Sequence, residues 1–101
     1  MKRIISITFA AALLLSGSAI AGDAAAGKTA YMAKGCVGCH GAGGVSVVPI
    51  YPALKGKKSG FIATNLTDFR SGTRANPTMN AMAAGLSDSD IANLAAYIGS
   101  L

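Results

Sequence analysis

Two cysteines three residues apart, followed at once by a histidine, constrain this chain more than any other feature: Cys36-Val37-Gly38-Cys39-His40. Covalent haem attachment requires this spacing, because the two thiols bond the vinyl groups of a porphyrin while the imidazole reaches the iron. We therefore expect Cys36 and Cys39 to hold one haem c and His40 to be an axial ligand. A redox dithiol would need alternating strands and helices, and a zinc site two further ligands; the sequence offers neither.

The first residues are typical of an export signal. Lys2 and Arg3 form a charged start, residues 4–15 are apolar, and residues 19–21 form a small-residue cleavage site. The apolar run is shorter than the roughly 20 residues that a membrane-spanning helix needs. We predict a cleaved signal peptide over residues 1–21, one domain over residues 22–101, and no membrane span after cleavage. An uncleaved tether is the alternative.

The remaining chain is short and poor in large apolar side chains, with three Phe in the whole sequence, no Trp and 13 Gly. Such a chain can barely build a core of its own. We expect the porphyrin to complete the core and the haem-free protein to be largely unfolded.

Charge argues against nucleic acid as a partner. Removal of Lys2 and Arg3 lowers the formal net charge from +5 to +3, and no dense basic stripe alternates with aromatic residues. The cluster Lys55-Gly56-Lys57-Lys58 can instead steer an acidic redox partner towards the protein.

The sequence predicts an all-α fold of four to five short helices around the haem. An Ala-rich segment over residues 23–34 favours a helix, whereas the Gly and Pro residues of 41–52 indicate a loop. A helix over residues 59–70 has Ser59 as its predicted N-cap and the apolar stripe Ile62, Leu66 and Phe69, which we expect to face the porphyrin. Asn76-Pro77 begins a short helix over residues 78–84, which Gly85 ends.

The last helix has the clearest signals. Ser87 and Asp90 resemble a capping box, and the residues that follow form one apolar face: Ile91, Leu94, Ala95 and Ile98. Ala92 and Ala96 are small enough for close approach. We expect this helix to cross the first one.

Methionine sulfur is the natural candidate for a sixth iron ligand, because His40 is the only His and both Cys are used. Met32, Met79 and Met82 remain after the leader is removed. Met32 lies on the Ala-rich helix and is interpreted as a core gap-filler. The ligand is then Met79 or Met82.

Several segments resemble a small class I cytochrome c: the Cys-Val-Gly-Cys-His motif, Asn76-Pro77-Thr78-Met79, Gly85-Leu86-Ser87-Asp88 and Leu94-Ala95-Ala96-Tyr97-Ile98. The chain is similar to small bacterial periplasmic cytochromes c and to one half of two-haem relatives. In that family the ligand methionine lies seven residues before the Leu of the Leu-Ser-Asp cap, which implies Met79, with Met82 as the runner-up. The resemblance also implies that a loop proline, here Pro49, offers its carbonyl to the axial His. The alternative is that Pro49 and Pro52 only shape the loop.

A His and Met pair fills both axial positions, so the expected function is electron transfer between respiratory redox proteins and not catalysis. We expect a periplasmic monomer that docks transiently through an exposed haem edge. One alternative is a haem-bearing subunit fixed in a larger oxidoreductase. Another is a ligand-binding sensor or peroxidase with a labile methionine, which rapid carbon monoxide binding would reveal. The sequence has no second His for acid and base work.

Overall fold

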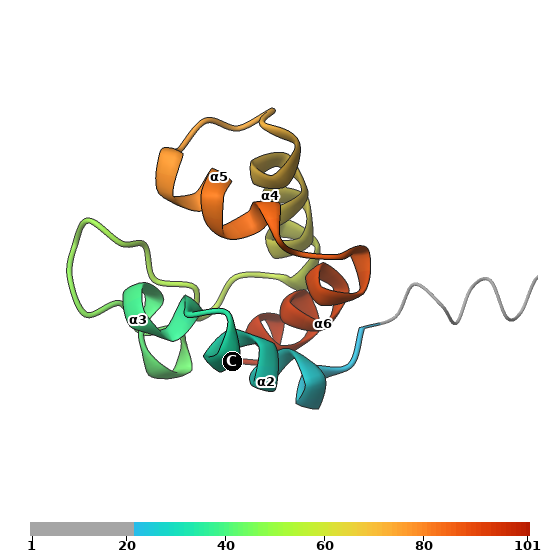
Figure 1. The fold of residues 1–101 in the computed structure, drawn as a ribbon. Helices are drawn as coiled ribbons and strands as arrows, with labels where there is room; N and C mark the ends of the chain where they lie inside the picture. Colours follow the sequence, from blue (N-terminus) through green and yellow to red (C-terminus); the bar gives the residue numbers. More distant parts are fainter. Residues whose placement is uncertain (1–21) are drawn as a thin grey trace, which may run out of the picture.

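The computed structural model describes residues 22–101, and the predicted signal peptide over residues 1–21 lies outside them. Within this range the fold is all-α, as predicted, with no strand. The elements in chain order are α2 (Ala24–Ala33), α3 (Cys36–His40), the short 3-10 helix η1 (Ala42–Gly44), α4 (Ser59–Ser71), α5 (Pro77–Ala84) and α6 (Asp88–Gly99) (Figure 1). Among these described helices, none has the length and apolar character needed to cross a membrane.

The helices α2 and α6 cross and make the most extensive helix–helix contact of the fold, which confirms the predicted crossing (Figure 1). Gly27 of α2 makes this contact possible. A Cβ atom placed on Gly27 would lie 1.9 Å from the carbonyl oxygen of Asn93 on α6, so any larger residue would push the helices apart. We expected Ala92 and Ala96 of α6 to allow this close approach, but it also depends on Gly27 of α2.

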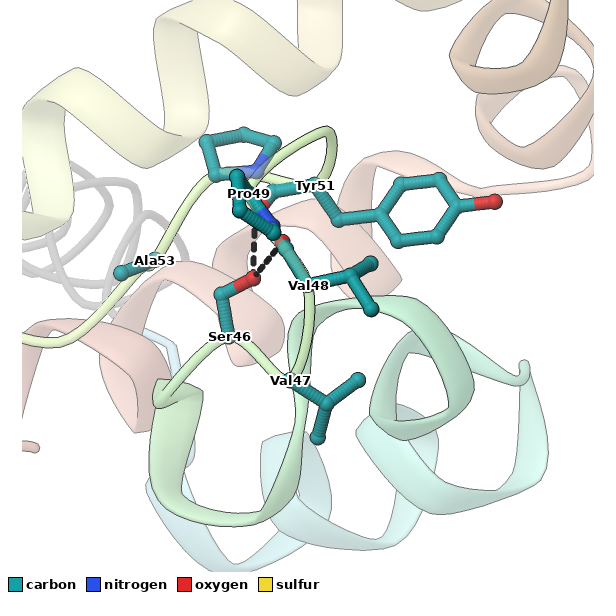
Figure 2. A pocket seen from close by; sticks show the side chains of 7 residues that line it. Ser46, Val47, Val48, Pro49, Tyr51 and Ala53 are labelled. Carbon is teal, nitrogen blue, oxygen red and sulfur yellow. Dashed lines mark hydrogen bonds between the residues drawn. The ribbon is translucent and has the colours of Figure 1, made fainter.

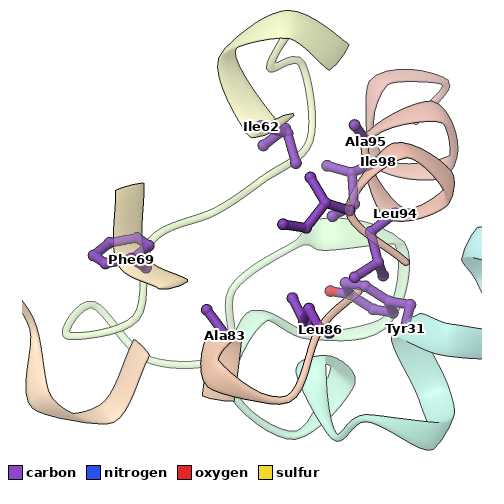
Figure 3. Close-up of a cluster of buried hydrophobic side chains, with 9 residues drawn as sticks. Tyr31, Ile62, Phe69, Ala83, Leu86, Leu94, Ala95 and Ile98 are labelled. Carbon is purple, nitrogen blue, oxygen red and sulfur yellow. The ribbon is translucent and has the colours of Figure 1, made fainter. Parts of the chain in front are cut away.

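The buried core begins at this crossing. Tyr31 of α2 is 0% exposed and Leu94 of α6 is 1% exposed. The Tyr31 ring also lies 5.5 Å from the ring of Tyr97, measured between centroids. Figure 3 shows Leu94 directed towards Tyr31, whereas Phe69 of α4 stands apart from both. The core thus extends from the crossing of α2 and α6 to α4, which contributes Ile62 and Phe69.

The N-terminus of α6 has the predicted capping box. The Ser87 hydroxyl accepts the backbone N–H of Asp90, and the Asp90 carboxylate accepts the backbone N–H of Ser87, each at 3.0 Å. This backbone hydrogen bond is the main cause that lowers the pKa of Asp90. Asp88 pairs with Arg70 at 2.7 Å. The two carboxylates are therefore structural, as the sequence indicated, and the predicted apolar face of α6 is buried.

The middle helices follow the prediction with one correction. Lys58, in extended conformation, is the N-cap of α4, and Ser59 is already the first helical residue. The predicted Ser59 cap is wrong by one residue because no side chain caps this end, so no local hydrogen bond fixed the boundary. In α5, the Asn76 side chain accepts the N–H of Met79 at 3.0 Å, and Pro77 occupies the first turn. The Asn-Pro start is confirmed.

Candidate cofactor site

A cavity of about 480 Å³ lies between α3, the loop after η1, α4, α5 and α6. Each predicted covalent or iron-binding residue lines it: Cys36, Cys39, His40 and Met79, with the runner-up Met82. Apolar side chains of α4 and α6 form much of the remaining wall, namely Ile62, Leu66, Phe69, Leu94 and Ile98. The apolar stripe of α4 therefore faces this cavity, so residues far apart in the sequence come together around one apolar space.

The two thiols enter the cavity from the short helix α3. Gly35 has a φ of 82°, a left-handed conformation that favours glycine, and it allows the chain to turn sharply from α2 into α3. Cys36 and Cys39 are both half-buried and form no disulfide. Burial raises the pKa of the Cys36 thiol, and the nearby Cys39 adds to this effect. Both sulfurs are available for bonds to a ligand in the cavity.

His40 is 8% exposed, and its ring is oriented by the backbone. Its Nδ1 lies 2.8 Å from the carbonyl oxygen of Pro52. Because a carbonyl oxygen can only accept, this bond requires a proton on Nδ1, and in the neutral imidazole the lone pair then lies on Nε2. The ring is thus held in the tautomer that a metal ligand needs.

The expected partner of His40 was Pro49, and this prediction is wrong, because Pro52 provides the carbonyl. Tyr51 N–H donates to the Val48 carbonyl at 3.2 Å, which makes residues 48–51 a turn with Pro49 at its second position. The exposed Pro49 therefore shapes the turn, the alternative role that its sequence context also allowed. The chain reaches His40 only after this turn, at Pro52.

The Ser46 hydroxyl holds this turn from inside the loop. It lies within hydrogen-bond distance of the carbonyl oxygens of Val48 and Tyr51 (Figure 2). The base of the loop is closed by Gly44, whose carbonyl accepts the N–H of Leu54 at 2.8 Å. These bonds fix the path of an otherwise exposed segment, so Pro52 has a defined position beside His40.

The two candidate methionines differ in their surroundings. Met79 is partly buried and packs against the core cluster. Met82 is 39% exposed, and its terminal methyl reaches the neighbourhood of Gly35, where a Cβ atom would lie 3.6 Å from it. Both side chains line the cavity, but Met79 is the more buried of the two, whereas Met82 is exposed and lies near Gly35, just before α3.

Tyr31 supports the site in a way that the sequence reasoning missed. Its hydroxyl donates to the carbonyl of Gly41, next to His40, at 2.6 Å. Burial raises the pKa of Tyr31 to about 12. A buried hydroxyl needs a hydrogen-bond partner, so a Tyr on the core face of an Ala-rich helix was the available signal that a polar group lies opposite.

The lining of the cavity fits a haem c. Two thiols match the vinyl groups, one neutral imidazole nitrogen and one thioether match the iron, and apolar side chains of α4 and α6 match the faces of the ring. The donor set and the largely apolar wall thus agree with the cofactor that the Cys-x-x-Cys-His motif predicts.

Comparisons with known proteins show what the whole described chain is similar to. The family model described as cytochrome c matches residues 24–101. Cytochrome c-554(548) of Halomonas halodenitrificans is 43% identical over 83 residues, which cover 79% of this chain and 98% of that protein. Cytochrome c4 of Pseudomonas aeruginosa is 41% identical over 80 residues, which cover 74% of this chain but 40% of the relative.

A solved structure shows the same fold. Cytochrome c4 of Acidithiobacillus ferrooxidans matches with a TM-score of 0.73 and 33% sequence identity, over 80% of this chain and 51% of the other. The chain therefore spans nearly all of one relative, but only about half or less of the cytochromes c4.

Proposed function

The chain belongs to the cytochrome c family, and from this premise we propose that it is a periplasmic carrier of single electrons between respiratory redox proteins. One haem c is attached through Cys36 and Cys39, with His40 and Met79 as axial ligands. The observation that carries the proposal is the placement of these four side chains around one largely apolar cavity. When bound, the haem supplies a one-electron couple centred on its iron.

His40 serves this function through the hydrogen bond to Pro52. Nδ1 donates its proton to the carbonyl oxygen at 2.8 Å, so in the neutral ring Nε2 would carry the lone pair for coordination. A bond of this kind also makes the imidazole a stronger donor. The Pro52 carbonyl thereby orients the ligand without touching the metal.

Met79 is the better candidate for the second ligand because its thioether is sheltered and its helix is fixed at the N-terminus by Asn76. If His40 and Met79 both bind the iron, no position on it would remain for a substrate, which supports a carrier over an enzyme. Thioether ligation and apolar neighbours such as Leu94 and Phe69 exclude water and favour the less charged, reduced state.

Redox partners would dock where the cavity reaches the surface. Ile50, which is 80% exposed, Phe61 and Met82 all line the cavity and are exposed. A patch of this kind suits a transient interface of less than about 1,200 Å² in total. Lys55 and Lys58 are exposed nearby in the chain, so added salt should slow association with an acidic partner.

The export signal belongs to the same proposal. Residues 1–21 would direct the chain to the periplasm, where haem is attached and the leader is removed. A mature N-terminus at Gly22, found by mass spectrometry, would support cleavage, and a retained leader would contradict it.

Substitution of each methionine tests the ligand assignment. We expect Met79→Ala to remove the sulfur-to-iron absorption band of the oxidised protein, whereas Met82→Ala, the matched control, should retain it. Loss of the band only in Met82→Ala would move the ligand to Met82. Retention in both variants would contradict both assignments, and absence of the band from the wild type would contradict thioether ligation.

A further inference from the structure

The short helix α5, which carries Met79, has little buried surface to hold it in place. Of the eight described residues of α5, only Ala83 is fully buried. Residues 71–78, which run from the end of α4 into the first turn of α5, are all exposed. A helix of this length is marginal by itself in water. Its position in the cavity wall must therefore depend on directed polar contacts as well as on apolar packing.

Asn80, the residue after Met79, makes three such contacts with its side chain. The amide nitrogen donates to the Phe69 carbonyl at 2.8 Å and to the Arg74 carbonyl at 2.9 Å. The amide oxygen accepts the backbone N–H of Asn76 at 2.9 Å. A carbonyl can only accept and an N–H can only donate, so these partners fix the orientation of the amide.

The three partners come from three successive parts of the chain. Phe69 lies in the last turn of α4, Arg74 lies in the connection that follows, and Asn76 is the N-cap of α5. The N–H of Arg74 also donates back to the Asp68 carbonyl of α4 at 3.1 Å. One side chain, that of Asn80, therefore joins the end of α4, the exposed connection and the start of α5.

Asn76 completes this arrangement around Met79. Its side-chain oxygen accepts the N–H of Met79 at 3.0 Å, and its backbone carbonyl accepts the N–H of Asn80 at 2.7 Å. Because Asn76 precedes Pro77, its backbone is restricted to the extended conformation that an N-cap needs. Asn76 and Asn80 thus hold each other, and the N–H of Met79 is part of the same set of hydrogen bonds.

We propose that Asn80 is a positioning residue for Met79: it fixes the first turn of α5 to the end of α4, so that the thioether stays on the iron. This inference rests on the proposed function, because it assumes that haem occupies the cavity and that Met79 binds its iron. Asn80 is not among the described residues that line the cavity, so it acts through the backbone of its helix. If this turn loosens, the thioether leaves the iron more often and an external ligand can enter.

Carbon monoxide binding to the reduced, haem-loaded protein measures how often the thioether leaves the iron. Asn80→Ala removes all three side-chain hydrogen bonds, and we expect it to bind carbon monoxide on the order of tenfold faster than the wild type. Asn80→Asp has nearly the same shape, but its carboxylate cannot donate to the two carbonyls, so it should also bind faster. Equal rates in the wild type and both variants would overturn the proposal.

Asn93→Ala is the matched control, because it removes the same side chain from a partly buried position outside the cavity. The Asn93 side-chain oxygen accepts the backbone N–H of Asp23 at 2.8 Å, between α6 and the start of α2. This change should lower stability but leave the carbon monoxide rate and the sulfur-to-iron band unchanged. Equal acceleration in Asn93→Ala and Asn80→Ala would show a general effect of stability and would contradict the positioning role.

A measurement on the wild type covers the case in which the Asn80 variants fold poorly. Both donors of the Asn80 amide are hydrogen-bonded. In the reduced, haem-loaded protein, these two hydrogens should therefore exchange with solvent much more slowly than those of a free asparagine. Exchange at the rate of a free asparagine, followed by NMR, would contradict the proposal.

The two proposals fail in different ways. Each protein is first checked for the mass of one attached haem, and the wild type for the sulfur-to-iron band. If the wild type shows both and the Asn80 variants bind carbon monoxide no faster than it does, the Asn80 proposal alone is wrong. If the wild type carries no haem, the proposed function fails as well.

Discussion

The two halves of the molecule differ in how their apolar side chains are covered. Between α2 and α6, protein packs on protein so closely that a Cβ on Gly27 would meet the backbone of Asn93. Between α3, α4 and α5, apolar side chains line a cavity of about 480 Å³. The first half needs backbone contact and no cofactor. The second has apolar surface that only a ligand can cover, so its stability depends on that ligand.

Of the changes that we predict, loss of the haem should have the largest effect, because it removes the ligand that the cavity half needs in order to fold. A chain with Cys36→Ala and Cys39→Ala cannot form the covalent bonds, and the wall built by α4 and α5 then has nothing to pack against. We expect it to lose cooperative folding, because a chain of this size has too small a core. The measurement is amide dispersion by NMR, with the haem-loaded wild type as the control. A well-dispersed spectrum of the haem-free chain would show that the cavity half folds by itself.

Gly27→Ala tests the other half. The added Cβ would lie 1.9 Å from the Asn93 carbonyl oxygen, so the helices must separate, at a cost of roughly 3 kcal/mol or more in the free energy of unfolding. Gly60→Ala is the matched control, because a Cβ on this helical glycine meets no atom within 4 Å. That change should raise stability by up to about 1 kcal/mol. Urea unfolding of both haem-loaded variants measures the difference, and equal values would refute the close-packed crossing.

Tyr31 joins the two halves, and its replacement should have the smallest effect. Tyr31→Phe removes the hydrogen bond to the Gly41 carbonyl and should cost about 1–3 kcal/mol at neutral pH, because that carbonyl loses its partner. The Tyr31 pKa in the folded protein is raised to about 12 from an ordinary value near 10, since burial disfavours the phenolate.

The raised pKa of Tyr31 predicts how the free energy of unfolding changes with pH. Above pH 10 the unfolded chain loses the Tyr31 proton while the folded chain keeps it, so the stability of the wild type falls between pH 10 and 12. The fall from this group is up to about 1.4 kcal/mol for each pH unit. Urea midpoints measured across this range should therefore decline less steeply in Tyr31→Phe. Parallel curves for the two proteins would contradict the buried, bonded hydroxyl.

Local signals allowed much of the fold to be predicted. The capping box of Ser87 and Asp90, the Asn76-Pro77 start and the apolar face of α6 are all encoded within a few residues, and the structure contains each of them. Helices are local in their hydrogen bonding, so caps and periodicity fix them without knowledge of the rest of the chain.

Features that depend on the path of the chain in space could not be predicted in this way. Whether Pro49 or Pro52 faces His40 depends on a turn that Ser46 holds from across the loop. The role of Gly27 depends on α6, some 65 positions later in the sequence. The cost of a glycine inside a helix made Gly27 a candidate for such a contact, but Gly60 of α4 has no neighbour at its Cβ position, so that cost alone does not identify one.

The residues of the candidate site also differ in whether the sequence alone could predict them. The spacing of Cys36, Cys39 and His40 is local, so the sequence alone predicted that these residues bind one ligand. In the structure they line the same cavity as Met79. Arg74 carried no motif of its own, and its place on the wall emerges only from its contacts with Asn65 and Phe69. Local spacing thus identifies the attachment chemistry, whereas the rest of the cavity wall can be identified only from the folded arrangement.

The most direct test of the account is the intact mass and visible spectrum of the protein after expression with haem-attachment machinery in the periplasm. The account predicts a red protein whose mass is that of the chain from Gly22 to Leu101 plus one covalently bound haem. A colourless protein with the mass of the bare polypeptide would contradict it.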